Sequence, residues 1–290
     1  MKILLTGGTG FVGSELLHLL VKSGKQVILL KRSTSGVERI ASILPHIQYY
    51  DSDNTDLDTI FKQNKIEQIV HLATDYARDK HFTRCYESNV TFPLLLLQKG
   101  FQYDVQRFIN TDSFSSLVEN LNYLPAYHIS KRHFKEWGTF IAKQENRTFI
   151  TTFLQHPYGP KDSDSKFISF IVNAIVNEVP HIDLTAGVQK RDFIHVRDVA
   201  AAYLALLEAV DAPKEIEIGT GQSHSIRSFV ERVKKIAKNT TTQLNFGKLP
   251  TRDNEIMNSV ADISAISQLG WKSATSLEDG IKELIANKRL

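Results

Sequence analysis

The sequence predicts an α/β fold, a doubly wound parallel sheet of the Rossmann type followed by a smaller C-terminal α/β substrate-binding lobe. Short apolar runs alternate with helical patterns through the first half, and a glycine cluster directly follows the first apolar run. The 290 residues also exceed an ordinary domain of about 150 residues. We therefore expect residues 1–153, with a later return segment near 184–218, to form the first domain, and residues 154–290 to form most of the second.

The elements follow in chain order. We predict strands at residues 2–6, 27–31, 47–51, 68–73 and 105–111, with helices at 12–23 and 92–98 between them. Strands and helices alternating at such short intervals indicate βαβ units and a parallel sheet. After about residue 153, strand and helix patterns alternate less regularly, and we predict helices at 167–176, 199–210 and 225–238. A last helix should begin near Ser276, because Glu278 and Asp279 then stand in its first turn.

Composition narrows the class of protein. Hydrophobic residues at 42% and charged residues at 23% are ordinary for a folded chain and exclude disordered, collagenous and low-complexity proteins. A net charge of +3 is too small to indicate nucleic acid or an anionic membrane as a partner. The first apolar run is too short for a signal peptide, and no stretch approaches the ~18 apolar residues of a membrane span. The single cysteine, Cys85, cannot form an internal disulfide. We therefore expect a cytoplasmic enzyme.

The glycine cluster predicts a dinucleotide site. Gly7, Gly10 and Gly13 stand between the first strand and the first helix, together with Thr9, Phe11 and Val12. Glycines at such a turn let the backbone approach a pyrophosphate, whose charge the helix N-terminus favours. We expect all six residues to contact the cofactor.

The end of the second strand indicates which cofactor. An NAD site usually carries Asp or Glu there, to accept from the ribose 2′-hydroxyl. This chain carries Lys31 and Arg32 followed by Ser33, which suit a 2′-phosphate and predict NADP(H). The alternative is that a nearby loop supplies an acid. Asp51 and Asp53, after the third strand, are each expected either to reach the adenine or to be solvated turn residues.

Tyr127 and Lys131 are candidates for acid–base chemistry. Their spacing places them one above the other on a helix face. A Lys ammonium beside a phenol lowers the pKa of the phenol and lets it exchange a proton near neutral pH. The same Lys can hold the ribose hydroxyls of a cofactor. Tyr76 and Lys80 share this spacing, but Tyr76 directly follows the fourth strand, where we expect a loop near the substrate.

These motifs, with HLA at residues 71–73, Thr111 and RDFIHV at 191–196, resemble the extended short-chain dehydrogenase/reductases, the NAD-dependent epimerase/dehydratase family. The resemblance implies that Thr111 hydrogen-bonds the reacting oxygen, that Tyr127 is the acid/base and that Lys131 activates it. It adds Leu72 and Ala73 to the cofactor contacts. It also implies a homodimer formed through the helix that carries Tyr127.

The resemblance further implies a nucleotide-diphosphate sugar as substrate. Arg191 and Arg252 match positions that usually hold the diphosphate, and two guanidiniums suit two phosphates. His156 stands where the family often has an Asn that touches the nucleotide. The residues expected to bind substrate are Tyr76, Asp112, Ser113, His156, Arg191 and Arg252. No metal site is expected, because the histidines have no partners at metal-ligand spacing.

Three further runs, NTDSF at 110–114, SKRHF at 130–134 and RDNEIM at 252–257, resemble the bacterial CDP-abequose and CDP-paratose synthases. This likeness implies reduction by NADPH of the 4-ketone of a CDP-linked 4-keto-6-deoxy- or 3,6-dideoxyhexose for surface polysaccharide such as lipopolysaccharide O-antigen. A 4-epimerase with tightly bound NAD is the main alternative. A 4,6-dehydratase is disfavoured because Ser113 stands where that class has its basic Glu, and a non-catalytic NADP-binding protein because the Tyr–Lys pair is intact.

Overall fold

Seven parallel strands form the central sheet in the computed structural model, which describes residues 1–118 and 123–289. Their order is β11-β6-β5-β4-β1-β2-β3. They are β1 (Lys2–Thr6), β2 (Gln26–Lys31), β3 (Gln48–Asp51), β4 (Gln68–His71), β5 (Arg107–Ser113), β6 (Thr148–Leu154) and β11 (Glu215–Ile218). The order changes direction between β1 and β4, and parallel sheets bind ligands at such a switch point, beyond the carboxyl ends of the strands. The predicted fold class is confirmed.

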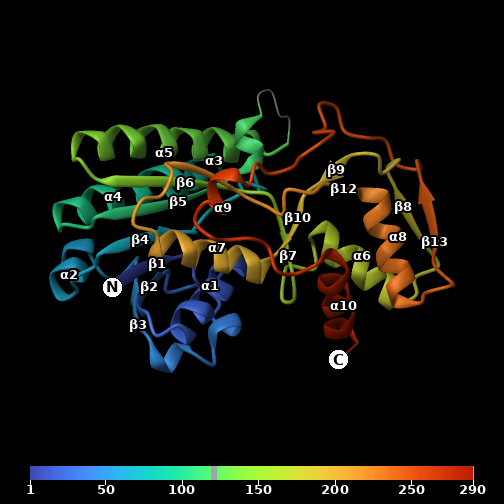
Figure 1. The fold of residues 1–290 in the computed structure, drawn as a ribbon, viewed down its shortest axis with the longest axis horizontal. Coiled ribbons are helices and arrows are strands. Elements are labelled where there is room, and N and C mark those ends of the chain that lie inside the picture. Colours follow the sequence, from blue (N-terminus) through green and yellow to red (C-terminus); the bar gives the residue numbers. More distant parts are fainter. Residues whose placement is uncertain (119–122, 290) are drawn as a thin grey trace.

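Helices cover both faces of this sheet (Figure 1). One layer contains α1 (Phe11–Lys22) and α7 (Val196–Glu208); the other contains α2 (Leu57–Gln63), α4 (Phe92–Gln102) and α5 (Pro125–Gln144). Within β1, Ile3 and Leu5 pack into the α1/α7 layer and Leu4 into the opposite one. A strand buried on both faces needs a continuous apolar run, which is why the sequence of β1 shows no polar alternation.

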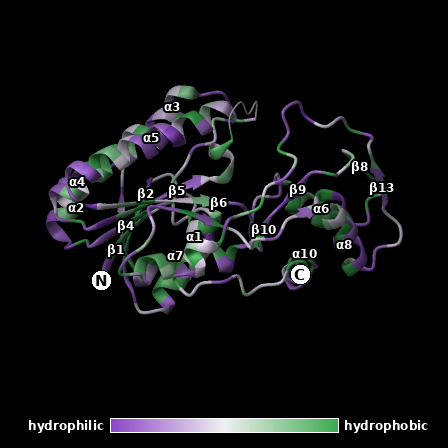
Figure 2. Cartoon of the chain, turned by 45° about the horizontal axis from the view of Figure 1, so that its top comes forward, coloured by the Kyte–Doolittle hydropathy of each residue, from purple (hydrophilic) through white to green (hydrophobic). Residues whose placement is uncertain are grey.

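The second lobe has its own apolar core, built around Tyr158, Phe193, Phe229 and Ile281. Its helices are α6 (Phe167–Val176), α8 (Ile226–Ala237) and α10 (Leu277–Lys288), of which α6 is the most hydrophobic (Figure 2). Short two-stranded ladders connect them: β7 (His156–Tyr158) with β10 (Phe193–His195), β9 (Lys190–Arg191) with β12 (His224–Ser225), and β8 (His181–Leu184) with β13 (Gln243–Phe246). The remaining short helices are α3 (Phe82–Tyr86) and α9 (Ser264–Ser267), and single turns stand at Glu38–Ile40, Leu44–His46, Glu87–Thr91 and Phe114–Leu117.

Most predicted elements are present, with shifted ends. The last helix begins as expected, because the Ser276 hydroxyl accepts from the Asp279 N–H at 3.1 Å and caps it. Strands β6 and β11 were not anticipated from the sequence. The strand predicted at 105–111 instead runs from Arg107 to Ser113, so that it ends two residues later. Among the described residues, no helix has the length and apolar character needed to cross a membrane.

Candidate active site

The glycine turn forms a cradle at the carboxyl end of β1. Gly7 adopts φ +71°, and a Cβ there would lie 2.5 Å from the backbone of Leu72 and Ala73. A Cβ on Gly13 would collide with the Gly7 carbonyl oxygen. Only glycine fits both positions, and the tight turn delivers the chain directly into α1. Thr9, Gly10, Phe11 and Val12 lie between these two glycines.

The start of α1 suits a diphosphate. No side chain caps its first turn, and that turn holds no acidic residue. Its N–H groups and the positive end of the helix dipole are therefore available to an anion. The cradle accordingly fits the pyrophosphate of a dinucleotide, as the sequence predicted for this turn.

The structure supplies acids at the end of β2 that could not be placed from the sequence. The Lys31 Nζ lies 2.5 Å from an Asp51 carboxylate oxygen, because β2 and β3 place these two residues side by side. Asp53 accepts from the Ser33 N–H at 2.8 Å, and these Ser33 hydrogen bonds lower the pKa of Asp53. Arg32 is exposed and forms no ion pair with any described residue. Of the two cations predicted to bind a 2′-phosphate, Lys31 is therefore paired with an acid, and Arg32 is the one available to bind the phosphate.

Tyr127 and Lys131 lie together on α5, and both are buried. The Lys131 Nζ donates to the Thr111 carbonyl at 2.8 Å and lies 5.9 Å from the centre of the Tyr127 ring. Burial lowers the pKa of Lys131 to about 8 and raises the pKa of Tyr127 well above its ordinary value. We expected Lys131 to lower the pKa of Tyr127, but burial of the phenol, with Tyr76 and Asp112 nearby, raises it. At neutral pH Tyr127 is therefore a protonated phenol.

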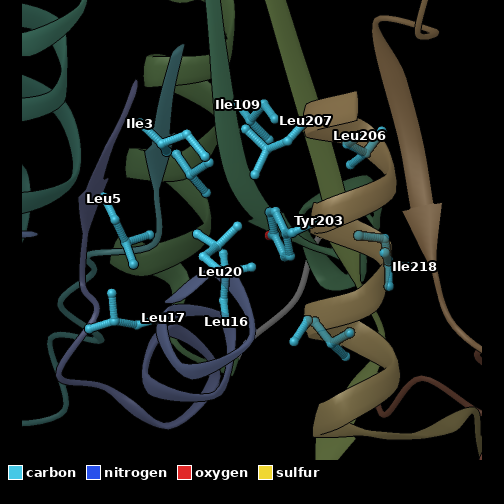
Figure 3. Packing of buried hydrophobic residues seen from close by; sticks show 14 of the residues in the cluster. Ile3, Leu5, Leu16, Leu17, Leu20, Ile109, Tyr203, Leu206, Leu207 and Ile218 are labelled. Carbon is cyan, nitrogen blue, oxygen red and sulfur yellow. The ribbon is translucent and has the colours of Figure 1, made fainter. Parts of the chain in front are cut away.

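The Thr111 hydroxyl, which the resemblance assigns to the reacting oxygen, has a hydrogen-bond partner on α7. Its Oγ1 lies 2.6 Å from the hydroxyl of Tyr203, which also bonds the Thr152 hydroxyl at 2.8 Å. Tyr203 belongs to α7 and is fully buried in the α1/α7 layer (Figure 3). Strand β5 continues to Ser113, whose half-buried hydroxyl lies 2.7 Å from the Ser115 hydroxyl. Thr111 is half-buried as well, so both hydroxyls are candidates to meet a ligand at this end of the strand.

The loop after β4 brings Tyr76 against Tyr127, with ring centres 5.0 Å apart and ring planes at 30°. Arg84 fixes this loop through ion pairs with Asp75 at 2.7 Å and Asp79 at 2.6 Å. Sequence reasoning missed a second support, Asn89, whose amide donates to the Asp75 carbonyl at 2.8 Å and to Ser130 on α5 at 2.9 Å.

Asp112 lies on the α5 side of the sheet end, with only 2% of its surface exposed. Burial raises the pKa of Asp112, whereas the charge of nearby Lys131 acts in the opposite direction. One of its carboxylate oxygens has no hydrogen-bond partner among the described residues. The sequence predicted that Asp112 binds substrate, and this buried oxygen is the atom that could do so.

The predicted substrate residues of the second lobe lie along one wall. The His156 ring packs 4.5 Å from Phe114, and burial, with Arg191 nearby, lowers the pKa of His156 to about 3. Arg191 pairs with Glu255 and donates to the Ile256 carbonyl at 2.5 Å. A diphosphate would therefore compete with Glu255 for this guanidinium.

Arg252 belongs to the same segment as Glu255. Its guanidinium lies 4.7 Å from the ring centre of Tyr123, just before α5. Asp192 ties the segment to the sheet, accepting from the N–H groups of Thr220 at 2.9 Å and Ala261 at 3.2 Å. Arg191 thus anchors the segment from which Arg252 reaches toward the first lobe. In the described part of the chain, no group of three His, Cys, Asp or Glu side chains could hold a metal ion.

Comparisons with known proteins show to which family the chain is similar. Residues 3–219 match the profile of the NAD dependent epimerase/dehydratase family. The chain is 36% identical to a CDP-abequose synthase of Salmonella muenchen, covering 99% of this chain and 98% of that protein. It is 33% identical to the CDP-abequose synthase of Salmonella typhimurium, with the coverage again 99% and 98%. Among solved structures, UDP-glucose 4-epimerase from Thermotoga maritima with UDP-glucose is similar at a TM-score of 0.87 and 25% identity, over 100% of this chain and 99% of that one.

Proposed function

Because the chain belongs to the NAD dependent epimerase/dehydratase family, we propose that it is a reductase that uses NADPH to reduce the 4-ketone of a nucleotide-linked deoxyhexose. The nucleotide is CDP, and the sugar is a 4-keto-6-deoxy- or 3,6-dideoxyhexose destined for surface polysaccharide. The full-length similarity to CDP-abequose synthases carries this proposal. We propose that the enzyme works in the cytoplasm.

The residues of the site fit a reduction. The glycine cradle, Leu72 and Ala73 hold the dinucleotide, whose nicotinamide supplies the hydride for C4 when bound. Tyr127 gives its proton to the oxygen that becomes negative, and a phenol that stays protonated at neutral pH is suited to that task. Lys131 offsets the charge left on the phenol and holds the ribose hydroxyls.

The second lobe holds the nucleotide sugar in this proposal. His156 and Arg191 form its inner wall, and Arg252 closes over the diphosphate from the exposed segment. Tyr76 and Asp112 border the sugar beside Tyr127. The sugar would therefore lie between the lobes, with its C4 at the carboxyl end of β5.

A 4-epimerase that retains NAD is the second candidate. The pairing of Lys31 with Asp51 favours it, because the end of β2 then carries less free positive charge for a 2′-phosphate. The Ser113 side chain cannot serve as a carboxylate base, which argues against 4,6-dehydration.

The deciding experiment follows the absorbance of reduced nicotinamide with a CDP-4-keto-3,6-dideoxyhexose generated in situ. NADPH and NADH are offered separately, and Tyr127→Phe is the control. We expect consumption of NADPH, slower consumption of NADH, and none in the variant. Activity restricted to dTDP- or GDP-linked ketosugars would show that the nucleotide of the substrate is dTDP or GDP and not CDP. Inertness toward every ketosugar, with NAD bound in the purified protein and equilibration of 4-epimers, would establish the epimerase instead.

We also propose a homodimer formed through α4 and α5. Leu95 on α4 and Ile129, Trp137 and Phe140 on α5 are large apolar side chains between 44% and 55% exposed. Their spacing on α5 places the three on one helix face, and a second copy of the chain would cover them.

A further inference from the structure

One arginine links the two ends of the loop that lies against Tyr127. Arg84, on α3, donates through Nε to Asp75 at 2.7 Å and through a terminal nitrogen to Asp79 at 2.6 Å. These two carboxylates flank Tyr76 in the sequence, and the Tyr76 ring stacks on that of Tyr127 with ring centres 5.0 Å apart. Arg84 therefore closes the segment between the two acids into a loop that carries Tyr76.

The backbone of this loop needs such a support. Ala77 and Lys80 adopt φ +51° and +61°, a left-handed conformation that residues with a Cβ rarely adopt. Such a residue raises the free energy of the folded chain and persists only where its surroundings hold it. The Asp75 carboxylate accepts from the Ala77 N–H at 2.7 Å, and the Asp79 carboxylate accepts from the His81 N–H at 3.3 Å. The same two carboxylates thus hold the turns of the loop and bind the arginine.

The two ion pairs fix the loop without contributing much to the stability of the whole protein. The side chains of Arg84 and Asp79 are 46% and 49% exposed, and that of Asp75 is 16% exposed. Exposed ion pairs add little to the free energy of unfolding, because water and salt screen the charges. Removal of the Arg84 guanidinium should therefore release the loop while the sheet and α5 stay folded.

We propose that Arg84 is a positioning residue that holds Tyr76 against Tyr127 and thereby keeps the Tyr127 hydroxyl directed at the reacting oxygen of the substrate. Tyr76 covers one side of the Tyr127 ring, so displacement of the loop removes a contact that orients the phenol. A misplacement of about 1 Å can lower the rate of a catalysed step about 10²-fold. The kinetic part of this inference rests on the proposed ketone reduction, whereas the hold on the loop can be measured without a substrate.

The first experiment compares hydrogen–deuterium exchange of residues 74–81 in the wild type, Arg84→Ala and Arg197→Ala. Arg197 pairs with Glu283 at 2.5 Å and its side chain is 52% exposed, so its variant loses an ion pair of the same kind between α7 and α10. We expect the loop amides to exchange about tenfold faster in Arg84→Ala and at the wild-type rate in Arg197→Ala. Equal exchange in all three proteins would overturn the proposal.

The second experiment measures kcat and KM for the wild type, Arg84→Ala, Arg84→Lys, Tyr76→Ala and the double variant Arg84→Ala/Tyr76→Ala. We expect kcat to fall about tenfold in Arg84→Ala. The KM for NADPH should stay unchanged, because Leu72 and Ala73 precede the loop. Arg84→Lys should keep kcat within about threefold of the wild type, since an ammonium can still reach one of the two carboxylates. The double variant should be no slower than Tyr76→Ala, because Arg84 acts through Tyr76.

Thermal unfolding separates positioning from folding, and we expect the melting temperature of Arg84→Ala within about 2 °C of the wild type. A wild-type kcat in either single Ala variant, or a double variant about tenfold slower than Tyr76→Ala, would overturn the proposal. If Arg84→Ala is not folded, Asp79→Asn carries the test, because it removes one ion pair and keeps the arginine; wild-type exchange of the loop in that variant would overturn the proposal. If the loop loosens as expected while the wild type reduces no ketosugar, the proposed function fails and the hold of Arg84 on Tyr76 stands.

Discussion

Replacing Thr111 by Val and Ser113 by Ala should separate a structural hydroxyl from a functional one. Val has the shape of Thr, so Thr111→Val removes only the 2.6 Å bond to Tyr203. The Tyr203 hydroxyl keeps Thr152 at 2.8 Å and is not left without a partner. The net loss is therefore that of one neutral hydrogen bond, about 1 kcal/mol, which lowers the melting temperature by roughly 2–4 °C. The variant should keep kcat within about threefold, because the lost bond lies in the α1/α7 layer.

Ser113→Ala should behave in the opposite way. We expect it to lower kcat about 10²-fold, because Ser113 is the last residue of β5 and the loss of a donor to the developing negative charge costs about that much. Its cost in stability is small, since Ser113 is half-buried and its side chain only caps a short turn through the Ser115 N–H. The assays are thermal unfolding monitored by circular dichroism and steady-state oxidation of NADPH. A 10²-fold loss of kcat in Thr111→Val, with Ser113→Ala near wild type, would show that Thr111 leaves Tyr203 to bind the substrate, and our reasoning would be refuted.

Three further predictions concern charge and assembly. Lys131→Met should be more stable than the wild type at pH 7, because burial lowers the pKa of Lys131 to about 8 and the charged lysine therefore costs folding free energy below that pH. In urea unfolding, the stability difference between the variant and the wild type should shrink between pH 8 and pH 10. A difference that grows with pH would contradict this prediction. Arg32→Ala should raise the KM for NADPH about tenfold and leave that for NADH within about twofold, since it removes a phosphate contact; equal effects on both cofactors would count against the 2′-phosphate role. Trp137→Glu should convert the proposed dimer to a monomer in light scattering after size exclusion, because it places a charge on the apolar face of α5. A monomeric wild type would contradict the proposed dimer.

The parts of the fold that could be predicted are those encoded in local patterns. The apolar run of β1 followed by the glycine turn needs no distant partner to be recognised, and the spacing of Tyr127 and Lys131 identifies one helix face. Strand β11 was missed because it is only four residues long, and its burial depends on pairing with β6, which lies far away along the chain.

The cofactor end of the site shows the same limit. Because Lys31 and Arg32 are adjacent, the sequence predicts a pair of cations at the end of β2. The pairing of β2 with β3 sets Asp51 beside Lys31, although the two residues are 20 positions apart. A local sequence pattern does not predict this pairing. The proposed preference for NADPH therefore depends on Arg32, because Lys31 is paired with Asp51.

The choice between Thr111 and Ser113 was beyond the sequence for a physical reason. Side chains two residues apart on a strand point to the same face, so periodicity cannot separate them. What separates them is where β5 ends and what lies opposite. The strand runs to Ser113, and the Tyr203 hydroxyl reaches Thr111 from a helix 92 residues further along the chain. A buried phenol needs a hydrogen-bond partner, and Thr111 and Thr152 supply it. Tyr203 thereby competes with a substrate for the Thr111 hydroxyl, which is why we expect Thr111→Val to change stability and Ser113→Ala to change kcat.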